Sequence, residues 1–465
     1  MKHRLPAALI PAAVLTAALA GAPAPAAADT TITTQPYLDS TGIPQLHAQG
    51  LDGTGVTIAM IDGQANPTVP ELAGANITIK PTCPDVVPDP ITVSHGTAVA
   101  SILVAPHYGW APKARIIDYV AAGTIDPTVD IKGVPTIACV DIIGYAINQA
   151  LNDGADIITI SLGTIQSATG AASNYALARA ADAGVPVIVG MGNDNTARAS
   201  TIAAMNLTVG VGAVDGTGQR AAYSNYGEGL VLMAYGGPPF TVRDPDTTGA
   251  LTVITEQAYG TSFAAPQVAG ALALAKQKWP HANGNQLIRV MNDTIDGIAD
   301  HKASNPTDQM GYGILNAPLL IATDPSGYAT DNPLTNKPGA FHPNAQDIQN
   351  YHDGLADPRN TAGDDTYVYR GCDPDILAHL PDGARTEPFT APECATVSPT
   401  TSGASPATQH TAPTNPTRPS GSSPVRIVIA ILASILLSGA GAGLWWSRKR
   451  PTTPAPPTPS EGTTM

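Results

Sequence analysis

Four residues of the 465-residue chain carry side chains that together can perform acyl transfer. Asp62 follows the apolar run "VTIAMI", His95 lies in "SHGTAVASIL", and Ser262 lies in "YGTSFAAPQVAG". Asn193, in "GMGNDN", carries an amide that can donate a hydrogen bond. An acid, a base, a hydroxyl nucleophile and an amide donor are the set needed to attack a carbonyl and hold the oxyanion that forms. The four residue types therefore indicate transfer of an acyl group.

Each of these residues also has a purely structural explanation. Asp62 and Asn193 can form turns, His95 can be a surface residue, and Ser262 can cap a helix. We expect Ser94 to cap the helix that starts at His95, which leaves the imidazole exposed and neutral at a helix N-terminus. The structural explanations are separate for each residue, whereas one chemical explanation covers all four.

The elements between about Thr54 and Leu320 predict how these side chains come together. Short β-branched runs alternate with segments that repeat apolar residues at helical spacing. The expected strands are 55–61, 114–121, 155–163, 185–192 and 206–214, and the expected helices include 139–154 and 171–184. This alternation predicts a parallel sheet with helices on both faces and ligands at the carboxyl ends of its strands. Asp62 and Asn193 should both lie on that edge.

The motifs "AMIDG", "SHGTAVAS" and "GTSFAAPQVAG", in the order Asp, His, Ser, resemble the subtilases, the subtilisin-like serine peptidases. The resemblance extends over about Gly42 to Ala322. It implies an α/β, subtilisin-like three-layer fold with a mostly parallel sheet between helices, and a serine endopeptidase that forms an acyl-enzyme. It assigns Asp62, His95 and Ser262 to the catalytic triad and Asn193 to the oxyanion hole.

The same resemblance implies a site for a polypeptide substrate. An extended peptide would pair with Ser161, Leu162 and Gly163, and Gly192 would also contact it. An ordinary strand end explains residues 161–163 equally well. No acidic cluster reads as a calcium loop, so we expect no metal and no cofactor.

One departure from the subtilase pattern lies next to the proposed acid. Subtilases usually follow this aspartate with Thr or Ser and then Gly, whereas this chain has Gly63 and Gln64. The missing hydroxyl would have donated a hydrogen bond to Asp62. We expect its loss to weaken Asp62 without silencing it, with the Gln64 carboxamide as the candidate replacement, and we expect Gly63→Thr to change turnover only modestly.

Both ends of the chain differ from the middle. Residues 1–28 have a basic start, an apolar run and small residues before the cleavage point, as in a signal peptide. Residues 427–446 are uncharged and long enough to cross a bilayer, and the basic cluster 448–450 should remain cytoplasmic. The alternatives are a membrane span for the first segment and a buried core helix for the second. We therefore expect a single-pass protein of the cell membrane, with the catalytic domain outside and the C-terminus in the cytoplasm.

The remaining boundaries follow composition. An N-terminal extension at 29–53 precedes a catalytic domain at 54–334, a polar Cys-containing appendage at 335–395, a Pro/Ser/Thr-rich stalk at 396–424 and a cytoplasmic tail at 447–465. Such an architecture, with little room for a pro-domain, resembles the mycosins, membrane-anchored peptidases of type VII secretion. It implies secretion-system membrane components as partners and secreted or envelope proteins as substrates.

Cysteine content and charge add two expectations. Four cysteines in an exported chain indicate two disulfides. We prefer Cys83 with Cys139 and Cys372 with Cys394, because each pair falls within one region, while the other two connectivities stay open. The net charge of −14 argues against nucleic-acid binding.

Two other functions remain open. A catalytically silent subtilase domain could serve as a structural component of an envelope or secretion complex. A broad-range nutritional protease fits the fold but does not explain a membrane tether.

Overall fold

The computed structural model describes most of the chain between residues 31 and 386. The described residues are 31–83, 86–125, 141–162, 171–199, 201–295, 309–337, 342–356, 368–371, 374–378 and 385–386. The expected signal peptide, stalk, membrane helix and cytoplasmic tail lie outside them. No helix within these ranges is both long and apolar enough to span a bilayer.

A seven-stranded sheet forms the centre of the molecule, and all of its neighbouring strands are parallel. In spatial order the strands are β2 (Asn76–Pro81), β4 (Arg115–Ala122), β1 (Thr57–Gly63), β6 (Ile157–Ile160), β7 (Val187–Gly190), β8 (Thr208–Val214) and β9 (Leu230–Tyr235). The central strands are buried along their whole length, as expected for a sheet covered on both faces.

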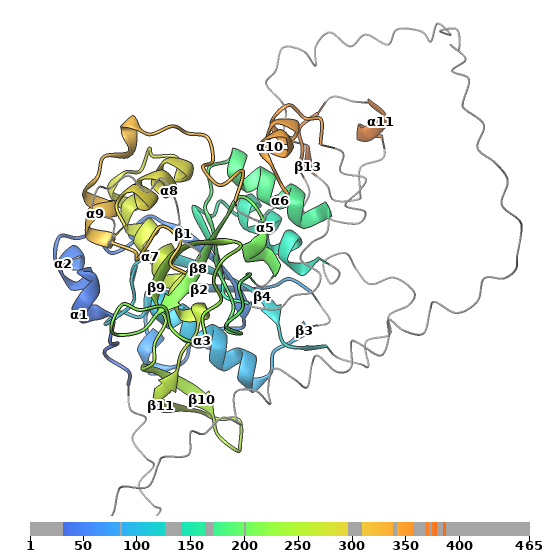
Figure 1. Cartoon of the computed structure of the whole chain (residues 1–465). Coiled ribbons are helices and arrows are strands. Elements are labelled where there is room, and N and C mark those ends of the chain that lie inside the picture. The colour runs from blue at the N-terminus through green and yellow to red at the C-terminus, as the bar shows by residue number, and fades with distance from the viewer. Residues whose placement is uncertain are drawn as a thin grey trace, which may run out of the picture.

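Helices cover the two faces of this sheet, which confirms the expected three-layer α/β arrangement. On one face lie α3 (Pro90–Val104) and α7 (Thr261–Lys278), which share an apolar core with Ile58 and Met60. On the other face lie α5 (Ile142–Asn152) and α6 (Ala171–Asp182), which share a core with Ala59 and Ile61. Figure 1 shows α7 and the α5–α6 pair on opposite sides of the strands.

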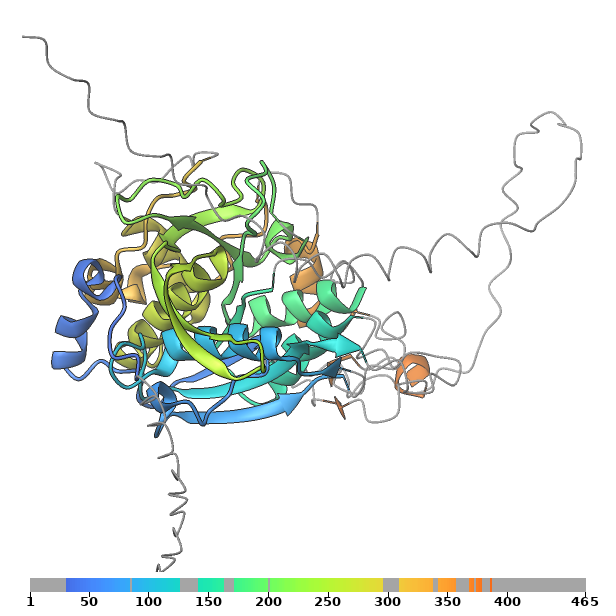
Figure 2. The same ribbon diagram turned by 90° about the horizontal axis from the view of Figure 1, so that it is seen from below.

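The remaining elements surround this framework. The helices are α1 (Leu38–Thr41), α2 (Ile43–Ala48), α8 (Gly284–Asp293), α9 (Ala317–Ala322), α10 (Ala345–His352) and α11 (Pro374–Leu377), with short 3-10 turns η1 (Pro70–Leu72), η2 (Thr201–Ala204) and η3 (Pro325–Gly327). The strands form three small sheets: β3 (Val86–Val87) with β5 (Thr124–Ile125), β10 (Phe240–Pro245) with β11 (Leu251–Ala258), and β12 (Val368–Tyr369) with β13 (Arg385–Thr386). Both views show α1 and α2 at one end of the molecule and α10 at the other (Figure 1 and Figure 2).

The segment expected to be an appendage packs in part against the sheet-covering helices. Within the described residues, α10 lies along α6, where His352 and Arg370 both contact the carboxylate of Asp182, at 2.9 and 2.7 Å. The hydroxyl of Tyr175 on α6 donates to the carbonyl of Val368. This part of residues 335–395 is therefore attached to the main domain.

The structure tests the expected disulfides only in part. Cys83 is disulfide-bonded. Cys139, Cys372 and Cys394 lie outside the described residues, so the connectivity stays a prediction.

Candidate active site

Asp62 lies at the carboxyl end of β1, where the ladder to β4 becomes irregular. The register shifts between Asp62 and Gly63, so that the chain leaves the sheet in a turn. Asp62 is fully buried, and its Oδ1 atom accepts a hydrogen bond of 2.6 Å from the Gly63 amide. The acid is therefore held by its own backbone, without a side-chain hydroxyl at position 63.

His95 lies in the second turn of α3, not at its start. Asp89 caps this helix through a capping box with Thr92, and Pro90 is its first residue. Ser94, the expected cap, instead donates to the carbonyl of Arg243 in the β10–β11 hairpin at 2.5 Å. The expectation that His95 is exposed at a helix N-terminus is therefore wrong, and its side chain is only 20% exposed.

The side chains of His95 and Asp62 are in direct contact. The distance between Nδ1 of His95 and Oδ1 of Asp62 is 2.7 Å. Burial lowers the pKa of His95, while the negative charge of Asp62 and the hydrogen bond raise it, and the net pKa is raised above the usual histidine value. Asp62 therefore orients the ring with Nδ1 toward β1 and stabilises a positive charge on it.

Ser262 lies in the first turn of α7, in reciprocal contact with Ser161 at the end of β6. The Ser262 hydroxyl donates to the Ser161 carbonyl at 2.9 Å, and the Ser161 hydroxyl donates to the Ser262 carbonyl at 3.0 Å. That carbonyl is free because Pro266, four residues later, has no N–H to donate within the helix. Among the described residues, Ser262 forms no hydrogen bond to His95.

His95 and Ser262 nevertheless belong to one cluster. The ring of Phe263, next to Ser262, stacks on the imidazole of His95 with centroids 6.3 Å apart. Helices α3 and α7 pack together on the same face of the sheet. The structure thus brings Asp62 and His95 into contact and sets Ser262 beside them, with its hydroxyl turned toward β6.

Asn193 is oriented by Thr261, a residue that the sequence analysis did not single out. The amide N–H and the hydroxyl of Thr261 lie 2.9 and 3.2 Å from Oδ1 of Asn193. Within the described part of the chain, neither Nδ2 of Asn193 nor the Ser262 backbone N–H has a hydrogen-bond acceptor. In the sequence, the signal that could have identified Thr261 is its position directly before the candidate nucleophile, Ser262.

The other expected substrate residues have different outcomes. Leu162 follows β6 and is partly exposed, whereas Gly163 lies outside the described residues. The Gly192 amide donates to the Thr261 hydroxyl at 3.0 Å, and the Gly192 carbonyl accepts from Asn225. Both polar groups of Gly192 are used within the protein, and only its carbonyl oxygen, with a second lone pair, can accept a further hydrogen bond.

The arrangement can perform nucleophilic acyl transfer. It contains a hydroxyl at a helix N-terminus, an imidazole oriented by a buried carboxylate, and two N–H donors without acceptors. The Ser262 hydroxyl would have to leave the Ser161 carbonyl before it could donate to His95. No group of three or more metal-binding side chains is found in the described ranges.

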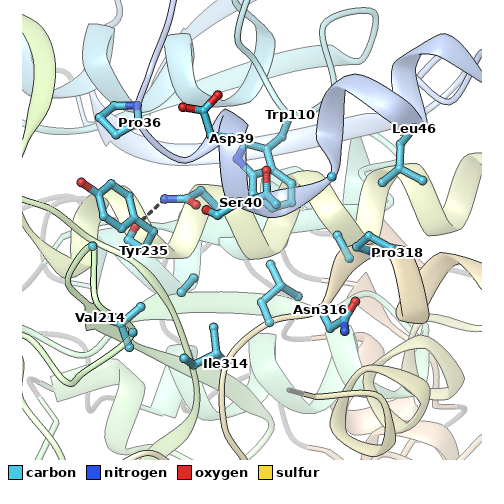
Figure 3. Close-up of a pocket in the computed structure, with 18 of the residues that line it drawn as sticks. Pro36, Asp39, Ser40, Leu46, Trp110, Val214, Tyr235, Ile314, Asn316 and Pro318 are labelled. Carbon is cyan, nitrogen blue, oxygen red and sulfur yellow. Dashed lines mark hydrogen bonds between the residues drawn. The ribbon is translucent and has the colours of Figure 1, made fainter. Parts of the chain in front are cut away.

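A large cavity lies elsewhere, between α1, α2 and the strand ends of β8 and β9. Its volume is about 1230 Å³, and Trp110, Tyr235 and Gln267 are among the residues that line it. The Gln267 side-chain amide donates to the Tyr235 carbonyl, and Figure 3 shows Tyr235 and Trp110 among the lining residues. None of the candidate catalytic residues lines this cavity, so it does not form part of the site described above.

Comparison with known proteins supports the same chemistry. The sequence profile of the subtilase family matches residues 53–313. Alkaline elastase YaB from Bacillus sp. (strain YaB) is 28% identical over 303 residues, which cover 62% of this chain and 70% of that protein. Subtilisin Savinase from Lederbergia lenta is 29% identical over 282 residues, which cover 59% of this chain and 93% of that protein.

A solved structure gives the same fold. Fervidolysin from Fervidobacterium pennivorans, described as a keratinolytic enzyme related to subtilisin, superposes with a TM-score of 0.51 at 24% identity. The superposition covers 62% of this chain and 46% of fervidolysin.

Proposed function

The chain belongs to the subtilase family of serine-type endopeptidases, and on this premise we propose that Asp62, His95 and Ser262 form its catalytic triad. The observation that carries the proposal is the 2.7 Å contact between Nδ1 of His95 and the fully buried carboxylate of Asp62. A buried carboxylate on Nδ1 leaves Nε2 as the proton acceptor, which is the tautomer that a general base requires.

The proposed reaction has two stages. Ser262 Oγ attacks the carbonyl carbon of the scissile peptide bond, while its proton passes to Nε2 of His95. Asn193 Nδ2 and the Ser262 backbone N–H donate to the oxyanion that forms. His95 then gives the proton to the departing amine, the C–N bond breaks, and water hydrolyses the acyl-enzyme by the same route.

The resting position of the Ser262 hydroxyl bears on an alternative function. Its bond to the Ser161 carbonyl must break before His95 can accept its proton. If the hydroxyl never leaves Ser161, the chain is a catalytically silent member of the family with a structural role. Catalytic hydrogen bonds are often long or poorly aligned until substrate binds, so this resting position is compatible with an active enzyme.

A fluorophosphonate probe distinguishes these two functions. The wild-type protein should be labelled covalently, and Ser262→Ala should not be labelled. Ser326→Ala is a matched control, because Ser326 is an exposed serine in the surface turn η3 and its replacement should leave labelling unchanged. Absence of labelling in folded wild-type protein, or equal labelling of wild type and Ser262→Ala, would exclude the proposed mechanism.

We also propose that the peptidase is tethered to the cell membrane and processes secreted or envelope proteins, in a mycosin-like role. The support is the uncharged run 427–446 with its basic cluster, together with the export signal expected at 1–28. A chain that ends at residue 424 should be found in the medium, and the full chain should remain in the membrane fraction. Comparison of the N-termini of exported proteins from wild-type and Ser262→Ala cells should then reveal the substrates. Recovery of the full chain from the medium would contradict the tether.

A further inference from the structure

A second carboxyl group is buried beside Asp62. Asp118 lies in the middle of β4 and is 0% exposed. Met60 of β1 pairs with Asp118 in the parallel ladder, so Asp118 projects from the same face of the sheet as Met60 and Asp62. Asp62 pairs with Val120, two residues after Asp118 on the neighbouring strand, so the two carboxyl groups are diagonal neighbours on one face of the sheet, and the negative charge of Asp62 raises the pKa of Asp118.

Each of the two carboxyl groups has one oxygen that is bonded and one that is not. Asp62 Oδ1 takes the bonds from His95 and Gly63, and Asp118 Oδ2 accepts from the Ala65 amide at 2.7 Å. Asp62 Oδ2 and Asp118 Oδ1 are both buried and have no hydrogen-bond partner among the described residues. Two unpaired buried carboxylate oxygens on one face are costly unless one of them carries a proton.

Asp118 is the group that keeps the proton. Asp62 takes two hydrogen bonds on Oδ1, from the His95 ring and the Gly63 amide, whereas Asp118 has only one amide donor. The pKa of Asp118 is raised to about 8. Burial is the largest cause, the hydrogen bond from the Ala65 amide lowers the pKa, and the negative charge of Asp62 raises it further. Met60 on β1 and Ile79 on β2 flank it in the sheet, and among the described residues Asp62 is the charged group that acts on it, with His95 beyond.

The residues directly after Asp62 do not supply a side-chain donor to it. A Cβ atom at Gly63 would lie 2.1 Å from the carbonyl oxygen of Thr92, so no side chain fits there. The Gln64 carboxamide, expected as the replacement, forms no hydrogen bond with any described residue. A donor for the second oxygen of Asp62 must therefore come from another element of the fold.

We propose that Asp118 is a positioning residue for the proposed catalytic acid: its neutral carboxyl group accepts from the Ala65 amide and donates its O–H toward the free oxygen of Asp62. It thereby takes the part of the hydroxyl that other subtilases carry after this aspartate. The proton stays on Asp118 throughout the reaction. The inference rests on the triad proposed above, because only a charged Asp62 needs this donor.

The turn that Asp118 holds also contacts the helix that carries His95. A Cβ atom at Gly96 would lie 2.0 Å from the Gly63 carbonyl oxygen, and the Asn66 amide donates to the Thr97 hydroxyl at 2.9 Å. A turn anchored by Asp118 therefore keeps both Asp62 and α3 in place, so the effect of Asp118 should appear in turnover more than in substrate affinity.

The test compares two substitutions of Asp118 in the full chain by steady-state kinetics on a peptide substrate. Asp118→Asn keeps one acceptor for Ala65 and one donor for Asp62, so its kcat at pH 7 should remain within about threefold of the wild type. Asp118→Val removes both, and loss of a hydrogen bond to a charged group predicts a kcat lower by about 10- to 150-fold with KM little changed. Thr159→Val is the matched control, because Thr159 is buried on the same face, pairs with Met60 from β6, and has an unpaired hydroxyl.

The pH profile separates positioning from simple packing. A carboxyl group protonated in the folded state ionises beside Asp62 as the pH rises through about 8. Wild-type kcat should therefore fall above this pH, and Asp118→Asn, which cannot ionise, should lack that fall. The proposal would be overturned if Asp118→Val kept the kcat of the wild type, or if Asp118→Asn lost as much activity as Asp118→Val. It would also be overturned if kcat of the wild type and of Asp118→Asn changed in the same way at alkaline pH.

A measurement that does not need the valine variant keeps the test decisive if that variant fails to fold. The infrared carbonyl band of a protonated carboxyl group should be present in wild type at pH 7 and absent from Asp118→Asn, and its persistence in Asp118→Asn would contradict the proposal. Labelling of wild type by the fluorophosphonate probe is checked first. Failure of that labelling rejects the proposed function, whereas labelled wild type with an unaffected Asp118→Val rejects only the role of Asp118.

Discussion

Gly63 is the residue of the site where the structure most changes the interpretation of the sequence. The glycine follows Asp62 in the place where subtilases usually carry a hydroxyl, and a modest effect was expected on restoring Thr there. The Thr92 carbonyl oxygen would lie 2.1 Å from a Cβ atom at this position, and the Thr92 carbonyl carbon 2.7 Å from it. Both atoms belong to the backbone of α3, so they cannot move aside without displacing His95.

We therefore predict that any side chain at position 63 damages catalysis strongly. Gly63→Ala and Gly63→Thr should each lower kcat/KM by about 100-fold or more, because displacement of a reacting group by about 1 Å costs that much. Circular dichroism checks that the variants fold, and peptide hydrolysis gives the rate. Gly216→Ala is the control, since a Cβ atom there meets nothing within 4 Å. Near wild-type activity in Gly63→Ala would show that the turn tolerates a side chain.

Some residues of the site were predictable from local sequence, and others depended on the fold. Asp62 and Asn193 could be placed at the carboxyl edge of a parallel sheet from the strands that precede them, whereas the pairing of Asp62 with His95 followed from the subtilase motifs. The cap of α3 was placed at Ser94, although Asp89 followed by Pro90 is the stronger start signal. Asp118 carried a signal as well, an acid inside a strand expected to be buried, but its relation to Asp62 depends on strand order, which one sequence does not determine.

At the scale of elements, the long apolar strands were predicted and the marginal ones were not. The five expected strands correspond to β1, β4, β6, β7 and β8, which are buried on both faces and read as continuous apolar runs. The edge strand β2 is only half-buried and contains Asn, Lys and Pro, so its run has no clear period. Strand β9 and the β10–β11 hairpin were also missed.

The β10–β11 hairpin braces the helix that carries His95. Arg243 in β10 forms a fully buried ion pair with Glu71 of η1 at 2.7 Å, and the carbonyl of Arg243 accepts from Ser94, next to His95. Removing one member of such a buried pair leaves an uncompensated charge and costs about 3 to 5 kcal/mol, so the hairpin and η1 stay joined in the folded protein. The position of α3 is therefore set from one side by the turn after Asp62 and from the other by this hairpin.

At the scale of the whole molecule, the segment after α9 is fastened across the amino ends of β8 and β9, at the sheet edge opposite Asp62 and Asn193. Asn332 bonds to Asn285 of α8 at 2.9 Å, and the Leu207 amide donates to the carbonyl of Leu334 at 2.9 Å. Lys337 then enters the protein between η2, β8 and β9 and is 5% exposed. The boundary expected at residue 334 therefore lies within a continuous strap.

Lys337 is the anchor of this strap, and its replacement should loosen it. Its Nζ atom donates to the carbonyls of Ala203 and Thr208 at 2.7 and 3.0 Å, to the Thr208 hydroxyl at 2.9 Å, and to the Gly229 carbonyl at 3.3 Å. Burial lowers the pKa of Lys337 to about 7, while these oxygens favour the ammonium form. Lys337→Met keeps the length of the side chain but leaves the buried acceptors without a donor.

We expect Lys337→Met to lower the free energy of unfolding by about 1 to 3 kcal/mol, which corresponds to a fall in Tm of roughly 2 to 12 °C for a domain of this size. Limited proteolysis should cut the variant between α9 and α10 faster than the wild type, while kcat at low temperature stays unchanged because Lys337 contacts none of the proposed catalytic residues. Lys278→Met, at an exposed position near the end of α7, should leave both Tm and cleavage unaffected. An unchanged Tm in Lys337→Met would mean that the strap is held by Asn332 and Leu334 alone. A fall in kcat that corresponds, as a free energy, to the loss of stability would mean that the strap supports the site directly.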